Sequence, residues 1–181
     1  MKKRVYGMVL ISLFSALTAA GAFIKIPLPY FDYITLQTLT VLLSGMILGA
    51  EAGAAAVTVY VLIGLCGVPV FAGGGGIDYA LRPSFGYLAG FILAAAVIGK
   101  LLEKSKRKSY KAHVIAGLLG LAALYLPGII YRYIILNAYM NTGIPLSAIL
   151  LTSVTIEIPK DILVCIFASW LAVRIKSALR R

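Results

Sequence analysis

"VFAGGGGIDYALRPSFGYLAGF", residues 70–91, places four consecutive glycines and an arginine inside a chain that is otherwise mostly apolar. Of the 181 residues, 61% are hydrophobic and only 13% are charged, and the mean hydropathy is +0.99. A soluble domain usually carries about 25% charged residues, so this chain has too few charges to cover its apolar surface. We therefore predict a single membrane domain over residues 1–181, in which the glycine stretch lies between two apolar spans.

Six apolar segments suit membrane-spanning helices, for which about 20 residues are needed. They lie near residues 5–24, 36–50, 53–68, 84–102, 112–140 and 147–174. The second and third are short, and the fifth is long enough to contain a surface segment or a break at Pro127–Gly128. The segments predict an all-α integral membrane protein, a bundle of six transmembrane helices.

The basic residues predict the orientation of this bundle. Thirteen of the 17 Lys and Arg residues fall in three clusters, before the first span, between the fourth and fifth, and after the sixth. These are Lys2, Lys3 and Arg4; Lys100, Lys104, Lys106, Arg107, Lys108 and Lys111; and Arg174, Lys176, Arg180 and Arg181. Six spans bring all three clusters to one side, which the positive-inside rule makes cytoplasmic, with both termini. The net charge of +11 is then explained by topology and contact with the lipid bilayer, not by nucleic acid.

The glycine stretch then lies on the outer face, together with residues 25–38 and 141–145. Irregular backbone at membrane depth is tolerated where it packs in protein or lines a cavity. Glycine also lets backbone approach a ligand closely, so we predict a folded loop facing a small polar group; a plain flexible turn is the alternative. The loop lacks the Lys-Ser/Thr ending of an ATP-binding P-loop.

The last span contains Glu157, Lys160 and Asp161 within apolar sequence. Charges inside a span usually face a partner or a cavity, so we predict a ligand role for Asp161, against a local Glu157–Lys160 ion pair as the alternative. Arg132 lies among tyrosines, where an interfacial or paired arginine explains it at least as well as ligand contact. The sequence offers no metal-ligand set and no pair of nucleophile and base, so we expect neither a metal site nor a catalytic site.

Small residues at Ala16 and Ala20 in the first span let helices pack closely in lipid. They serve either packing within the bundle or docking onto another protein.

Four segments resemble the BioY family, the biotin-binding S components of energy-coupling factor (ECF) transporters. They are "ITLQTLTVLLSGMILG" (34–49), "GLCGVPVFAGGGG" (64–76), "RPSFGYLAGF" (82–91) and "PKDIL" (159–163). The resemblance covers nearly the whole chain in order and spacing. It implies a non-catalytic, multi-pass subunit in a prokaryotic cell membrane that captures biotin from outside. It also implies docking through Ala16 and Ala20 onto a membrane-embedded coupling protein with two cytoplasmic ATPases, which use the ATP; the chain needs no cofactor of its own.

The resemblance also implies a set of biotin-binding residues. They are Gln37, Phe71, Ala72, Gly73, Gly74, Gly75, Tyr79, Arg82, Ser84, Phe85, Tyr87, Lys160 and Asp161. Asp161 suits the ureido N–H groups, loop amides suit the ureido carbonyl, and aromatic side chains suit the apolar part of biotin. Arg82 is the first candidate for the carboxylate and Lys160 the second. The chain departs from many members by Lys160 in place of glycine, Val164 in place of lysine, and the added charge of Arg82.

Other functions stay open at this point. An S component for a different vitamin would share the fold. A stand-alone transporter would need no ATPase subunits, but evident inverted repeats are missing. An intramembrane enzyme would use Glu157 and Asp161 as paired carboxylates and would need a further catalytic group.

Overall fold

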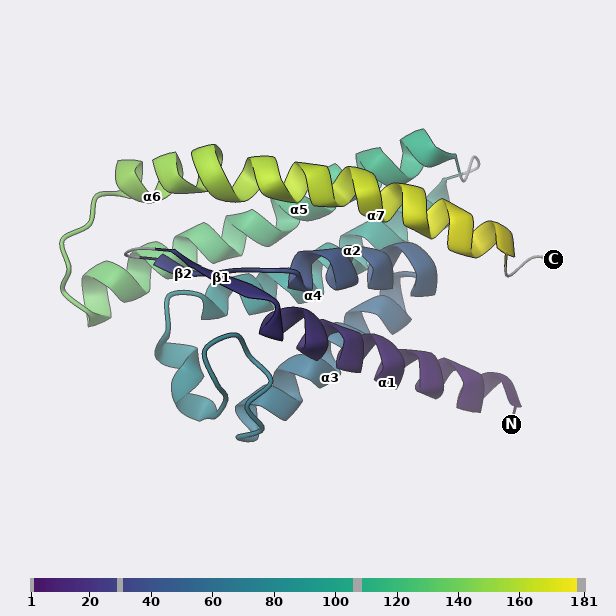
Figure 1. Cartoon of the computed structure of the whole chain (residues 1–181), viewed down its shortest axis with the longest axis horizontal. Helices are drawn as coiled ribbons and strands as arrows, with labels where there is room; N and C mark the ends of the chain where they lie inside the picture. The colour runs from purple at the N-terminus through teal and green to yellow at the C-terminus, as the bar shows by residue number, and fades with distance from the viewer. Residues whose placement is uncertain (1, 29–30, 106–108, 179–181) are drawn as a thin grey trace.

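The computed structural model describes residues 2–28, 31–105 and 109–178, which form six helical rods and one small hairpin (Figure 1). In chain order the elements are α1 (Lys2–Phe23), β1 (Lys25–Leu28), β2 (Phe31–Thr35), α2 (Gln37–Leu48), α3 (Ala50–Leu65), the 3-10 helix η1 (Ile77–Leu81), α4 (Phe85–Lys104), α5 (Tyr110–Ile134), the π-helix η2 (Ile135–Tyr139), α6 (Leu146–Thr152), the π-helix η3 (Ser153–Glu157) and α7 (Ile158–Ala178). The prediction of an all-α, six-helix protein is confirmed. The antiparallel β1–β2 hairpin, in which Lys25 pairs with Thr35, was not predicted.

Glycines let neighbouring rods approach closely. On α4, Gly86 lies against Tyr131 and the Pro127 carbonyl, and Gly90 lies against the backbone of Leu124. A side chain at either glycine would overlap α5, so the small residues fix this pair of helices side by side. This is the packing that helices use in lipid, where close backbone contact replaces the hydrophobic effect.

The two termini and the connection between α4 and α5 lie at one end of the bundle (Figure 1). The hairpin, η1 and the connection between α5 and α6 lie at the opposite end. Arg4, Lys104, Lys111 and Arg174 therefore share one end, as the charge pattern predicts, whereas Lys106–Lys108 and Arg180–Arg181 lie outside the described residues. Which side of the membrane this end faces stays a prediction.

Three described helices are long and apolar enough to cross a membrane: Arg4–Phe23, Phe85–Lys104 and Tyr110–Tyr139. The apolar helices α2 and α3 have 12 and 16 residues. At 1.5 Å per residue α2 covers about 18 Å, well short of the roughly 30 Å of a bilayer core. The hairpin precedes α2 and the glycine loop follows α3. These non-helical segments therefore fill the part of the bilayer thickness that the two short helices do not span.

Two segments late in the chain depart from α-helical geometry, the π-helices η2 and η3. The break that the length of the fifth segment allowed at Pro127–Gly128 does not occur: α5 runs unbroken through Pro127, and its regular pattern changes only at Ile135. In the last rod the π-helix η3 ends two residues before Pro159. Proline has no N–H to donate four residues back, which removes an α-helical bond at this point of the rod.

Candidate ligand-binding site

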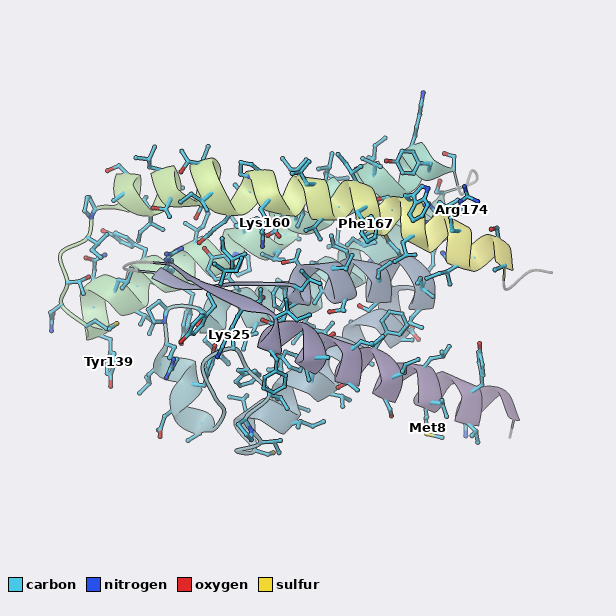
Figure 2. All side chains as sticks on the ribbon, viewed as in Figure 1. Met8, Lys25, Tyr139, Lys160, Phe167 and Arg174 are labelled. Carbon is cyan, nitrogen blue, oxygen red and sulfur yellow. The ribbon has the colours of Figure 1, made fainter. Side chains whose placement is uncertain are left out.

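A cavity of about 340 Å³ lies within the bundle, a volume typical of small-molecule sites. Residues of the hairpin, of the loop segments around η1, of α2, α4 and α5 with η2, and of the last rod all reach it. Its lining comprises Tyr33, Ile34, Thr35, Gln37, Thr38, Ala72, Tyr79, Pro83, Ser84, Tyr87, Leu88, Phe91, Leu124, Tyr125, Arg132, Leu136, Met140, Glu157, Lys160 and Asp161. Figure 2 labels Lys25 and Lys160 in the half of the bundle away from the termini, and Met8 and Arg174 in the other half.

Asp161 is the buried carboxylate of this cavity, with 3% of its surface exposed. The Tyr125 hydroxyl donates to its Oδ2 at 2.7 Å. Its Oδ1 lies 2.7 Å from Lys160 Nζ. That contact is an ion pair without hydrogen-bond alignment, and Oδ1 has no hydrogen-bond donor among the described residues. Asp161 thus has one oxygen bonded to Tyr125 and one in an ion pair with Lys160 that accepts no hydrogen bond from the described residues.

Glu157 forms a second polar cluster, and the alternative of a Glu157–Lys160 pair is wrong. Its Oε1 lies 2.9 Å from Arg132 Nη1, so the ion pair joins η3 to α5. Its Oε2 accepts from the hydroxyl of Ser153 at 2.9 Å and from that of Tyr87 at 3.3 Å. Arg132 is 4% exposed and is therefore a paired, buried arginine, which the sequence left undecided.

Gln37 lies at the start of α2, where it ties the hairpin to the bundle. Its side-chain oxygen accepts from the Thr35 hydroxyl at 2.9 Å, and its amide nitrogen donates to the Tyr60 hydroxyl. Tyr60 in turn donates to the Val70 carbonyl at 3.3 Å. This chain of bonds connects β2, α2, α3 and the glycine loop, and Tyr60 is a residue that sequence reasoning missed.

The glycine stretch is an ordered turn. Phe71 N–H donates to the Gly74 carbonyl at 2.8 Å, and Gly74 N–H donates back at 3.1 Å. Gly74 and Gly76 have φ of 120° and 103°, which side chains other than glycine disfavour. Gly73, Gly74 and Gly75 do not line the cavity. Two of the loop N–H groups that we expected to face a ligand, those of Phe71 and Gly74, donate to carbonyl oxygens within the turn instead.

The Phe71 side chain holds this turn against the core of the bundle. It is 2% exposed, and its ring lies 5.5 Å from that of Tyr60 and 4.5 Å from that of Tyr79, measured between centroids. Gly64 leaves the space that the Phe71 ring fills. Phe71 is therefore a core residue behind the wall, and only its neighbour Ala72 reaches the cavity.

The remaining predicted residues divide between the wall and its surroundings. Tyr79, Ser84, Tyr87 and Lys160 line the cavity. Phe85 packs against Tyr131 outside it, at 5.8 Å between ring centroids. Arg82 is exposed and also lies outside the lining.

Ala16 and Ala20 lie on the exposed face of α1. The face that packs into the bundle carries Phe14, Thr18 and Ala22 instead. The two alanines therefore do not serve packing within this chain.

A bundle of apolar helices with an internal, partly polar cavity defines a membrane protein that binds a small molecule. The chain matches the BioY family over residues 1–181 and belongs to that family. It is 42% identical over 173 residues to a probable biotin transporter BioY of Lysinibacillus sphaericus, covering 96% of this chain and 88% of the relative. It is 42% identical over 130 residues to the biotin transporter BioY of Thermotoga maritima, covering 71% and 73%. The crystal structure of the S-component for biotin from an ECF-type ABC transporter superimposes with a TM-score of 0.83 at 25% identity, over 97% of this chain and 93% of that one.

Proposed function

We propose that this chain is the biotin-binding subunit of an ECF-type transporter. It captures biotin and passes it through the membrane with the help of separate ATP-hydrolysing subunits. The single observation that supports this most strongly is Asp161: a buried carboxylate whose Oδ1 accepts no hydrogen bond from the described residues, in a cavity of ligand size, within a chain of the BioY family. Because the chain has no nucleotide-binding loop of the P-loop type, ATP hydrolysis belongs to its partners.

In this proposal the six rods cross a prokaryotic cell membrane with both termini in the cytoplasm. Arg4, Lys104, Lys111 and Arg174 lie at the end that holds the termini, and cytoplasmic loops carry an excess of Lys and Arg. The hairpin end then faces outward, and biotin enters from that side. The partners are a membrane-embedded coupling protein and two cytoplasmic ATPase subunits.

The ureido ring of biotin is placed at Asp161, whose Oδ1 accepts from a ureido N–H. The aromatic walls formed by Tyr79, Tyr87 and Tyr125 surround the apolar part of the ligand, since aromatic side chains bury apolar surface and keep a polar tip. Gln37 is held by two bonds within the protein, so its role is to fix the hairpin over the ligand. Asp161 and Glu157 each have a basic or hydroxyl partner, which suits binding better than acid–base catalysis.

Titration of the purified chain in detergent with biotin, followed by calorimetry, tests this function. We expect saturable binding of one biotin, with other vitamins failing to compete. Competition by another vitamin with equal strength would favour an S component of different specificity. Biotin uptake into vesicles that contain only this chain would favour a stand-alone transporter.

Docking is tested separately on α1. A bulky residue in the Ala20→Trp variant blocks close approach of a partner helix, because small residues permit that approach. We expect biotin binding to stay intact and ATP-driven uptake with the partner subunits to be lost. Val9→Trp, a change of a residue that is 57% exposed near the other end of α1, is the matched control.

A further inference from the structure

Lys25 is a cation at the edge of the cavity that sequence reasoning did not select. It is the first residue of β1 and is exposed. Its Nζ lies 2.5 Å from the Ala72 carbonyl oxygen and 4.6 Å from the centroid of the Tyr33 ring. Both Ala72 and Tyr33 line the cavity. The hairpin therefore brings an ammonium group to the wall of the site, next to the glycine turn.

Arg82 reaches the same turn from the other direction. Its guanidinium carbon lies 5.3 Å from the centroid of the Tyr79 ring, and Tyr79 lines the cavity. Its Nη1 lies where a Cβ on Gly73 would stand, so the missing side chain of Gly73 makes room for the cation. Since Ala72 and Gly73 are consecutive, with Cα atoms about 3.8 Å apart, the two cations contact neighbouring points of one backbone turn.

Each of these cations is supported by a tyrosine ring. A cation over an aromatic face is attracted to the ring and restricted in position. Two long side chains that would otherwise move freely in solvent are thus held at the same part of the wall.

The interior of the cavity offers no comparable cation. Arg132 is engaged by Glu157 at 2.9 Å, and Lys160 by Asp161 at 2.7 Å, so the two acidic and two basic residues of the lining balance. An added carboxylate would have to compete with one of these pairs, and removing a partner from a buried pair is costly. Among the side chains that the structure describes, by contrast, no carboxylate lies within ion-pair distance of Lys25 or Arg82.

We propose that Lys25 and Arg82 together bind the free carboxylate of the ligand, at the turn formed by Ala72 and Gly73. The inference rests on the proposed function, because biotin has both a ureido ring for Asp161 and a free carboxylate at the end of its chain. Lys25 is then a specificity-determining residue: it selects ligands whose chain ends in an anion over esters and amides. Hydrogen bonds between a cation and a carboxylate are stronger than those between neutral groups. Such bonds suit a site that is partly exposed to solvent.

The test compares biotin with biotin methyl ester, which keeps the ureido ring and removes the charge. Calorimetric affinities are measured for the wild-type chain and the variants Lys25→Gln, Arg82→Gln and the double variant. We expect the wild type to prefer biotin over the ester by tenfold or more. Each single variant weakens biotin binding about tenfold, the worth of one charged hydrogen bond, and leaves the ester unaffected.

The ester serves as the internal control for folding, and Lys111→Gln, at the end that holds the termini, is the matched charge control. Association of biotin also slows with ionic strength if the two cations attract it, and the double variant loses this dependence. Equal wild-type affinity for biotin and ester, or an unchanged preference for biotin in Lys25→Gln, overturns the inference while the proposed function stands. A wild-type chain that binds neither compound refutes the proposed function itself, and the inference with it.

Discussion

The hydrogen bond from Tyr125 to Asp161 leads to a sharp prediction about ligand binding. In the Asp161→Asn variant, the Tyr125 hydroxyl still needs an acceptor and takes the oxygen of the new amide. The amide NH₂ group then faces the ligand where Oδ1 stood, so two donors meet when the ureido N–H arrives. The loss includes a hydrogen bond to a charged group, worth about 1.5–3 kcal/mol, and leaves a buried donor unsatisfied. We expect biotin affinity to fall by about 2–3 kcal/mol, or roughly 30- to 150-fold.

The rescue of this loss identifies its cause. Adding Tyr125→Phe removes the competing hydroxyl, so the amide oxygen turns toward the ligand and accepts from the ureido N–H. We expect the double variant to bind biotin about tenfold more tightly than Asp161→Asn alone, although Tyr125→Phe by itself weakens binding. Calorimetric titration of the four proteins in detergent completes the cycle, and melting temperatures without ligand control for folding. If the two changes add without rescue, or if Asp161→Asn binds as the wild type does, our reasoning about Asp161 is refuted.

Two further predictions concern the stability of the walls. Arg132→Met leaves Glu157 buried without its cation, so we expect a loss of about 3–5 kcal/mol of unfolding free energy, most of it restored when Glu157→Leu is added. Unfolding in detergent, followed by circular dichroism, measures the stability of both variants. A double variant no more stable than Arg132→Met alone would contradict the prediction. Gly64→Ala inserts a methyl group into the space of the buried Phe71 ring, and we expect about 1–3 kcal/mol of destabilisation together with weaker biotin binding. Gly7→Ala, where the space is open, is the control and should leave both quantities unchanged.

The general architecture was readable from the sequence because it follows from hydropathy and charge. Apolar runs gave six rods, and the clusters of Lys and Arg placed their ends together. The β1–β2 hairpin was not readable, since Lys25–Thr35 lies within a segment too short and too mixed to show a strand pattern. The sequence also left open a break at Pro127, which does not occur. A helix can contain a proline when neighbouring elements pack against it, and Gly86 packs against the Pro127 carbonyl here.

The candidate site was readable in part. Asp161 and Tyr87 line the cavity because charged and polar residues within a span must face something other than lipid. The partners of the charges were not readable, since Glu157 pairs with Arg132 from a different rod, 25 positions away in the chain. Phe71 shows the converse error: proximity in sequence to the glycines suggested ligand contact, whereas its ring fills the core.

The polar contacts around the cavity also explain how a hollow can persist in this bundle. Helices in lipid are held by close packing, and the lining of a cavity loses those contacts on one side. Bonds from Tyr125 to Asp161 and from Arg132 to Glu157 tie α5 to the last rod across this gap, and Tyr87 adds α4. An unpaired polar group in apolar surroundings is costly, so breaking either pair would destabilise the bundle. The groups that we propose to recognise the ligand and the groups that hold the cavity open therefore belong to one network.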